Sequence, residues 1–482
     1  MYEDEARLCL EITGKLGATY ADARFLNSKT LTLQVDDAGF TSRETFELSF
    51  GVRVIADGMW GFAGANKIDR RYCNDVATRA VKIAKLAAKG SKGKIRLAPT
   101  STQKGTYSNS IRKDPFEISV RDIADLLTTS ARIVKDQSSE IKSASAGVYA
   151  FQEDKYIANS EGSAVFQRSV GCGPSMSGSA VSNGKVLRRS YPESLGWDIS
   201  TRGYESIEEA DLQSNAKIVG GDVVKLINAG RCRNERTDLI IYGDLLAIHV
   251  HETVGHATES DRATDTEWDF AGSSFLTPEK RGNFQFGSEC VNIVADATIP
   301  NGTGSYDFDD ELVPGKRISL IEKGLFCGYQ SSRETAMNLG LGESSGAMRA
   351  MYGTRIPLIR MTNINLEPGD WSRDEIIKDT KDGILATGAI LAIFDQRRRT
   401  FIFGGEIGWR IANGDVREAI KFPIYSDTSV NLWKSCDAIS KEDLECFGVS
   451  CGKGRPHQSM RVGHFCSTAR FRGVPVGDPT AQ

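Results

Sequence analysis

The spacing of hydrophobic positions in the first 90 residues predicts helices at both ends and strands between them. From Ala6 to Leu16 the apolar residues recur with a period near 3.6, and Gly17 follows as a stop signal. Residues 72–89 return to this helical period, and Asp57-Gly58 is a hairpin turn signal. Alternating patterns predict strands at residues 21–26, 31–35, 46–55 and 59–62. This order favours an α+β fold whose sheet is mixed or antiparallel.

The pattern continues in the same way up to residue 228. Residues 98–115 are polar and rich in turn formers, which predicts a long loop, and a helix is expected near 117–135. Strand-like alternation extends from about 139 to 191, and the Gly/Ser-rich segment 171–184 is expected to interrupt it. One long helix is predicted over 206–228.

A domain boundary is predicted at Gly230, where the long helix ends. Residues 1–230 then form an N-terminal α/β domain, and residues 231–482 form a C-terminal domain. Beyond the boundary, short apolar runs are separated by Gly, Pro, Asn and Asp, and helical patterns occur only near 243–258 and 330–338. The second domain is therefore expected to be β-rich, with a barrel or sandwich-like arrangement.

Composition narrows the class of protein. The chain has 482 residues, a formal net charge of −3, 40% hydrophobic and 26% charged residues, which is typical of a soluble globular protein. Near-neutral charge disfavours nucleic acid as a partner. No run approaches the ~20 apolar residues that a membrane helix needs, and the first residues are acidic rather than signal-like. Ten scattered cysteines in a chain of this size indicate reduced thiols, so we expect a cytoplasmic protein with no membrane association.

Three of the five histidines, His249, His251 and His256, lie within eight residues. They follow an apolar strand (residues 239–242) and Gly243, and Asp244 is a suitable N-cap for the helix that carries them. A single histidine is more often a core or surface residue than a ligand. Three in one helical segment, with Glu252 among them, favour a metal site instead.

The spacing H-E-x-x-x-H differs from the metallopeptidase pattern H-E-x-x-H, which places both rings on one helix face. On a straight helix His251 and His256 would be about 140° apart. A one-residue π-bulge would realign them. Alternatively His249 and His256, seven residues apart, share a face of a straight helix. Glu252 lies beside the two histidines in either arrangement, as a general base would, and Glu259 and Asp261 follow as carboxylate partners for the rings.

A catalytic zinc site needs a third protein ligand. The C-terminal segment offers Cys446, Cys451, His457 and His464, which could form a separate structural zinc site. The five residues between Cys451 and His457 are too few for a zinc-finger arrangement, in which about twelve intervene. Cys451, expected on a glycine-flanked turn, is the better candidate for the distant third ligand.

The sequences HETVGHATESD (251–261) and CGKGRPHQ (451–458) resemble the paired signatures of the TldD/PmbA family, and specifically its metal-bearing branch. The resemblance covers nearly the whole chain. Supporting matches are Gly51-Val-Arg-Val54, residues 299–311, Pro314-Gly315, residues 320–324, Gly328-Tyr329 and Arg360-Met-Thr-Asn363.

The resemblance implies a zinc peptidase that hydrolyses unfolded peptides and forms a dimer, either with itself or with a metal-free family member. Its ligands would be His251, His256 and Cys451, and Glu252 would be the general base; His249 has no counterpart. A thiolate ligand weakens zinc as a Lewis acid, so a slow enzyme is expected. The alternatives are a non-catalytic subunit of a peptidase complex, or a metallohydrolase of a small amide.

The chain departs from the family pattern at residues 386–399, where a glycine-rich loop is usual. The run Arg397–Arg399 in this segment either holds a substrate carboxylate or forms a solvated loop, and the loop is the favoured interpretation.

Overall fold

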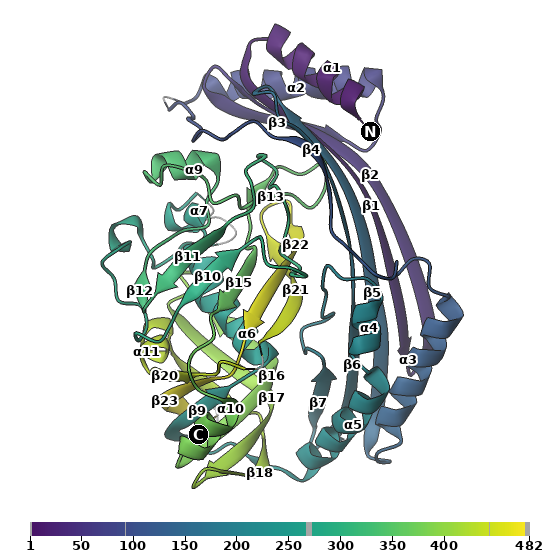
Figure 1. Cartoon of the computed structure of the whole chain (residues 1–482), viewed down its shortest axis with the longest axis vertical. Helices are drawn as coiled ribbons and strands as arrows, with labels where there is room; N and C mark the ends of the chain where they lie inside the picture. Colours follow the sequence, from purple (N-terminus) through teal and green to yellow (C-terminus); the bar gives the residue numbers. More distant parts are fainter. Residues whose placement is uncertain (1, 92, 267–271, 443, 478–482) are drawn as a thin grey trace.

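The computed structural model describes residues 2–91, 93–266, 272–442 and 444–477. Its N-terminal part is one long curved sheet of seven described strands with helices at both ends (Figure 1). The elements are α1 (Glu3–Lys15), β1 (Ala18–Asp36), β2 (Gly39–Ala56), β3 (Met59–Ala65), α2 (Arg70–Ala88), β4 (Lys104–Ser108), α3 (Val120–Lys135), β5 (Ile141–Asn159), β6 (Ala164–Ser182), β7 (Lys185–Tyr191), α4 (Glu205–Glu209) and α5 (Leu212–Asn228). The strand order is β3-β2-β1-β5-β6-β4, with β7 also paired to β6. Because β4 alone pairs in parallel among these described strands, the sheet is mixed, as predicted.

The two faces of the sheet make different contacts, and successive side chains along β1 point to alternate faces. Odd-numbered side chains from Ala21 to Phe25 pack with α1 and α2, and Leu31 to Val35 pack with α3 and α5. Even-numbered Asp22 and Arg24 point to the other face, where they join buried ion pairs toward the C-terminal half. Figure 1 shows the C-terminal half in the concavity of this sheet.

Helix predictions hold at α1, α2 and α3, but the predicted long helix over 206–228 is two helices. It breaks between α4 and α5 at Asp211, which adopts a left-handed φ of 40°. The Asp211 side chain accepts a hydrogen bond from the backbone N–H of Ser214 and so caps α5.

Three strand predictions are corrected by long-range pairing. Segments 21–26 and 31–35 form one strand, β1, because β2 and β5 satisfy its backbone on both sides through the polar residues 27–30. The predicted loop 98–115 contains the short strand β4, which pairs with β6. The Gly/Ser-rich segment does not interrupt β6. At Gly173 a Cβ atom would lie 2.1 Å from the backbone O of Asp198, so glycine admits a neighbouring chain there.

The C-terminal part is β-rich. Its elements are β8 (Gly230–Arg231), β9 (Glu235–Ile241), α6 (Asp244–Val250), a π-helical turn (His251–Gly255), a 3-10 turn (His256–Thr258), α7 (Ser260–Ala263), a second 3-10 turn (Pro278–Lys280), β10 (Ile293–Asp296), β11 (Arg317–Glu322), β12 (Leu325–Phe326), α9 (Arg333–Asn338), β13 (Met348–Arg349), β14 (Leu358–Ile359), β15 (Asn363–Leu366), α10 (Arg373–Asp379), β16 (Asp382–Phe394), β17 (Thr400–Ala412), β18 (Asp415–Lys421), β19 (Ile424–Thr428), α11 (Ser429–Lys434), β20 (Cys436–Ile439), β21 (Glu445–Lys453), β22 (Gln458–Cys466) and β23 (Ala469–Val476).

Two sheets organise this part. Strands β16-β9-β23-β19-β17 close into a barrel because β17 also pairs with β16, which is the barrel alternative of the prediction. The second sheet has the order β12-β11-β10-β15-β22-β21. Helix α6 lies between the two, in contact with β16 and β17 of the barrel and with β15 and β22 of the sheet. The largest apolar cluster among the described residues surrounds this helix.

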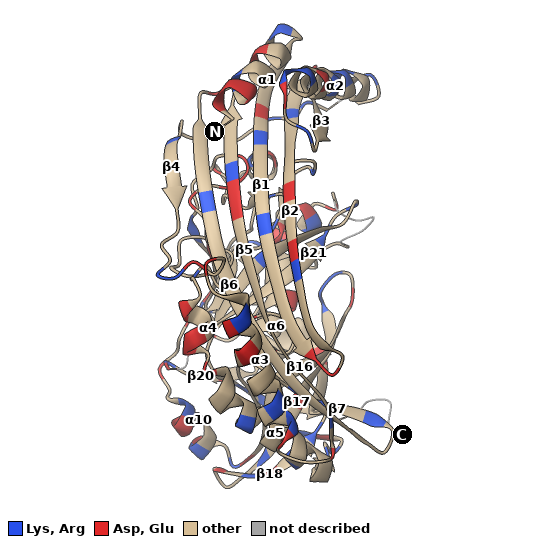
Figure 2. Ribbon diagram, turned by 90° about the vertical axis from the view of Figure 1, so that its right-hand side faces the viewer, with Lys and Arg blue, Asp and Glu red and all other residues tan. Residues whose placement is uncertain are grey.

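The surface carries charges of both signs. Figure 2 shows basic and acidic residues interspersed along the long strands and the terminal helices. In the described ranges no helix is both long and apolar enough to cross a membrane.

Candidate metal centre

The histidine-bearing helix begins where strand β9 ends, as predicted, but its start differs from the prediction. Gly243, with φ 65°, is the N-cap, and Asp244 is the first helical residue without a side-chain cap bond. The Asp244 carboxylate instead accepts hydrogen bonds from the backbone N–H groups of Ser194 (2.8 Å) and Gly388 (3.0 Å). It therefore fixes the start of the helix to the N-terminal part and to β16.

The predicted bulge is present. Helix α6 passes into a π-helical turn at His251–Gly255 and then into a 3-10 turn. The wider turn absorbs the extra residue of H-E-x-x-x-H. As a result the rings of His251 and His256 lie on one side of the helix, with centroids 4.8 Å apart.

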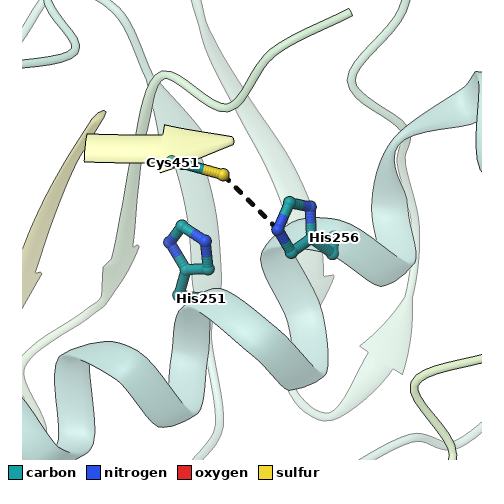
Figure 3. A group of neighbouring side chains, drawn as sticks. All are labelled: His251, His256 and Cys451. Atoms are coloured by element: carbon teal, nitrogen blue, oxygen red, sulfur yellow. Dashed lines mark hydrogen bonds between the residues drawn. The ribbon is translucent and has the colours of Figure 1, made fainter. Parts of the chain in front are cut away.

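Cys451 meets the two histidines from the neighbouring sheet (Figure 3). The ligand atoms of His251, His256 and Cys451 all lie within 4.8 Å of one another, and all three residues are buried. The Cys451 Sγ is 3.5 Å from His256 Nε2. Cys451 lies on strand β21, not on a turn as predicted; the turn follows at residues 454–457.

A buried ionic group holds the outer nitrogen of His256. Its Nδ1 is 2.9 Å from Glu259 Oε2, which also accepts from Arg262 Nε at 2.6 Å. Burial raises the pKa of the Glu259 carboxyl, but Lys453, His256 and Arg262 outweigh it and hold this pKa well below the usual range. Glu259 is therefore an anion that accepts the Nδ1 proton, as predicted for this residue. Asp261 instead binds Lys453 Nζ, at 2.7 Å.

His464 holds His251 in the corresponding way. Its Nδ1 is 3.1 Å from the backbone O of Ile364, and its Nε2 is 2.9 Å from His251 Nδ1. Burial, followed by the charge of His251, lowers the pKa of His464 well below its usual value, so the ring is neutral. A neutral His464 that donates to a carbonyl from Nδ1 must accept at Nε2. His251 therefore donates from Nδ1.

These bonds leave the Nε2 lone pair of each histidine free. Both lone pairs are available to one metal ion together with the Cys451 thiol. Burial lowers the pKa of His251 and lowers that of His256 to about 4, so both imidazoles are neutral as metal ligands must be. Two imidazole nitrogens and one thiol sulfur form a donor set that suits zinc and leaves a fourth position for water or substrate. The residues present thus fit a metal of this kind.

His249 takes no part in this group. Its ring is fully buried among Phe401, Phe403, Tyr425, Trp433 and Phe471, and neither nitrogen has a hydrogen-bond partner within the described part of the chain. Burial lowers its pKa to about 3. The alternative pairing of His249 with His256 is therefore wrong, since His249 is a core residue.

The alternative structural site in the C-terminal segment does not form among the described residues. His457 is exposed, and His464 binds His251 instead. Cys446 and Cys451 are an odd number of residues apart on β21, so their side chains lie on opposite faces of the strand.

Glu252 has a buried basic partner that the sequence interpretation missed. Its carboxylate binds Arg398 Nη1, and the two side chains are 11% and 8% exposed. Arg397 and Arg399 are exposed, so the solvated-loop interpretation holds for them and is wrong for Arg398. Arg262 has no predicted role, and His464 is predicted only as a ligand of the alternative structural zinc site. Of the two buried cations beside Glu259, only Lys453 has a sequence signal, because it lies in the C-G-K piece.

Comparisons with known proteins agree over the length of the chain. Three family models match: PmbA/TldA metallopeptidase domain 1 over residues 21–88, the central domain over 113–229 and the C-terminal domain over 234–477. A metalloprotease of Methanocaldococcus jannaschii is 30% identical over 448 residues, which cover 92% of this chain and 94% of that protein. A zinc metalloprotease TldD homolog of Saccharolobus solfataricus is 25% identical over 96% of this chain and 97% of its own.

Solved structures share the fold. A protein of Thermotoga maritima described as a modulator of a DNA gyrase superposes with a TM-score of 0.79 at 15% identity, covering 99% of this chain and 100% of its own. TldE from Thermococcus kodakarensis gives 0.73 at 17% identity, covering 98% of this chain and 100% of its own.

Proposed function

The chain belongs to the TldD/PmbA family of metallopeptidases, and we propose that it is a zinc-dependent peptidase that hydrolyses unfolded peptides. The observation that carries the proposal is the group His251, His256 and Cys451, whose ligand atoms lie within 4.8 Å of one another beside Glu252. Metalloprotease names at modest identity support the reaction class.

The roles of the residues follow from their surroundings. His251 and His256 would bind zinc through Nε2, and Cys451 through its thiolate. Zinc bound there would lower the pKa of a water molecule toward ~7 and polarise the scissile carbonyl. Glu252, next to His251 in the π-helical turn, accepts the proton of the attacking water and later passes it to the departing amine. Glu259 and His464 keep the imidazole rings in the ligating tautomer.

Strand β21 offers the substrate a place beside the metal. It is the edge strand of its sheet among the described strands and carries Cys451. Gly448 shows which backbone groups of β21 point away from β22. Its C=O accepts from the Ile199 N–H at 3.1 Å, and its N–H donates to the Asp198 carboxylate at 3.1 Å. By the period of two, residues 450 and 452 face the same way. An extended peptide that pairs there is held by main-chain hydrogen bonds, so cleavage has low sequence specificity and needs an unfolded substrate.

The proposal extends to partner and compartment. The protein works as a dimer, with a second copy or with a metal-free family member, and sedimentation with and without such a member distinguishes the two. Its location is the cytoplasm. All ten cysteines are free in the structure, which is compatible with a reducing compartment.

The variant Glu252→Gln tests the reaction. It keeps the ligands and removes the base, so we expect stoichiometric zinc and a loss of turnover on a denatured protein substrate. Metal content and product release are measured on the same preparation. Cleavage at the wild-type rate would reject the mechanism, and stoichiometric zinc in Cys451→Ala would reject the thiolate ligand.

The same experiment addresses the two alternatives. A non-catalytic subunit would show no cleavage in the wild type, although this chain retains His251, Glu252, His256 and Cys451 together. A small-amide hydrolase would cleave dipeptide amides and leave unfolded proteins intact.

A further inference from the structure

The turn between β16 and β17 is built to hold Arg398 in one place. Arg398 has a left-handed φ of 64°, which is unusual for a residue with a side chain. Its N–H donates to the backbone O of Asp395 at 3.0 Å, and its own backbone O accepts from Ser429 Oγ at 2.8 Å. The neighbouring Arg399 N–H donates to the Asp395 carboxylate at 3.0 Å. Strained backbone held by several bonds is typical of functional sites.

The Arg398 side chain leaves solvent and enters the candidate metal centre. Its guanidinium carbon lies 3.8 Å from the centre of the Phe394 ring, which supports the group from one side. Nη1 binds Glu252, the proposed base. Nε is buried and has no hydrogen-bond partner among the residues that the structure describes. The guanidinium therefore retains donor capacity beside the reacting groups.

The other buried cations near the site each bind a fixed partner other than the proposed base, although Arg262 Nη1 and Arg360 Nε also have no hydrogen-bond partner among the described residues. Arg262 binds Glu259, and Lys453 binds Asp261 and the backbone O of Ile359. Arg360 donates to the backbone O atoms of Gln458 (3.0 Å) and Cys451 (2.5 Å). Among the described cations of this region, Arg398 alone has the proposed base as its one hydrogen-bond partner.

We propose that Arg398 is a catalytic residue that donates hydrogen bonds to the scissile carbonyl oxygen as negative charge develops on it. The inference rests on the proposed peptidase function and adds an electrophile to it. Peptide hydrolysis needs such a group, since stabilising the developing oxyanion is a large part of catalysis. A thiolate among the metal ligands makes a second electrophile more important.

The arrangement keeps charge balanced during attack. The water oxygen bonds to the carbonyl carbon, its proton goes to Glu252, and the carbonyl π pair moves to the oxygen. The negative charge thus leaves Glu252 and appears on the substrate, and Arg398 exchanges one acceptor for the other. When the C–N bond breaks, the proton passes from Glu252 to the amine nitrogen, and the pair with Arg398 is restored.

The test compares Arg398→Gln with two matched controls from the same turn, Arg397→Gln and Arg399→Gln, whose side chains are exposed. We expect kcat for a quenched peptide to fall about 100- to 1000-fold in Arg398→Gln with little change in KM, because the lost bond forms in the transition state. The controls retain wild-type rates, and zinc content is unchanged in all three.

A second measurement needs no turnover. A phosphinic peptide, whose tetrahedral anion imitates the transition state, should bind Arg398→Gln about 100- to 1000-fold more weakly than wild type, and the controls normally. Should Arg398→Gln fail to fold by circular dichroism, Arg398→Lys is used; it keeps the charge, and an at least tenfold loss in both assays is expected.

Several results would overturn the inference. An unchanged kcat in Arg398→Gln would do so. An increased kcat would also do so, because it would show that Arg398 inhibits Glu252 by binding it. A rise in KM alone, together with lost discrimination against C-terminally amidated peptides, would make it a carboxylate-binding residue instead. If wild type does not cleave, or Glu252→Gln does, the proposed function itself fails; if both behave as expected and Arg398→Gln matches its controls, only this inference fails.

Discussion

Histidine has three roles within one small region of this protein, and the contacts of each ring nitrogen decide which. The His249 ring packs against aromatic side chains, and its nitrogens have no hydrogen-bond partner among the described residues, so it is a neutral core residue. His251 and His256 each have one nitrogen bound by an acceptor, which directs the other nitrogen to the candidate metal centre. His464 is the acceptor for His251 and is itself fixed by a carbonyl.

Burial of His249 predicts a specific pH dependence of stability. Its pKa is about 3 in the fold and near 6.5 when unfolded. Between these values the unfolded chain binds the extra proton, so stability falls as the pH falls below about 6.5, by up to about 1.4 kcal/mol per pH unit. Urea denaturation at pH 7 and pH 5 should show wild type losing about 2 kcal/mol more than His249→Phe. Parallel losses in the two proteins would contradict this origin, and zinc content should be equal in both.

The contact between His464 and His251 predicts an effect on metal affinity. Removing the acceptor in His464→Phe frees the His251 ring to rotate or to change tautomer. We expect zinc affinity, measured by competition with a chelator, to fall about 10- to 100-fold. His457→Gln, which changes the exposed histidine of the same segment, should bind zinc like wild type. Equal affinities in all three proteins would show that His464 does not position the ligand.

At the scale of elements, the π-helical turn converts a sequence irregularity into a binding geometry. Gly255 within the turn has a reason of its own, since a Cβ there would lie 2.4 Å from Met361 Sδ. The helix can therefore rest directly on the residues that lead into β15. The extra residue in H-E-x-x-x-H is the sequence feature that predicts this turn.

Elements with a strong local period could be predicted, whereas their partners could not. The periods of α1, α2 and α3 identified these helices without knowledge of their neighbours. The path of β6 through a glycine-rich segment depends on residues 198–200, which approach it from elsewhere in the chain. The same limit applies at the site. Arg398 lies 146 residues from Glu252, and His464 lies 213 residues from His251. No local pattern encodes such separations.

At the scale of the whole molecule, buried ion pairs join the long sheet to the C-terminal half. Asp310 binds Arg24 at 3.2 Å and Lys155 at 3.0 Å, and Arg53 binds Glu311 at 3.1 Å. These side chains come from the even-numbered face of β1 and from the neighbouring strands. The division at residues 230 and 231 stays a prediction, and a separated N-terminal part would expose these charges.

The central position of Asp310 predicts a large effect on stability. Asp310→Ala leaves the buried Arg24 without its carboxylate and leaves Lys155 with Glu153 alone, which should lower the free energy of unfolding by about 3–5 kcal/mol. Chemical denaturation followed by fluorescence measures the loss. Asp4→Ala removes an exposed ion pair with Arg7 and should cost at most about 1 kcal/mol. Similar small losses for both variants would mean that the ion pairs of Asp310 contribute little to holding the two halves together.

The order of strands in the barrel also determines when the barrel can form during translation. Strand β23 lies between β9 and β19, so the barrel that seats the histidine helix cannot close until β23 has left the ribosome. Cys451 follows His256 by 195 residues. While most of the second half is being made, the growing polypeptide therefore contains both His251 and His256. During that time it lacks Cys451, and its barrel is not closed. Translation products that stop before β21 lack Cys451 and therefore cannot complete the candidate metal centre.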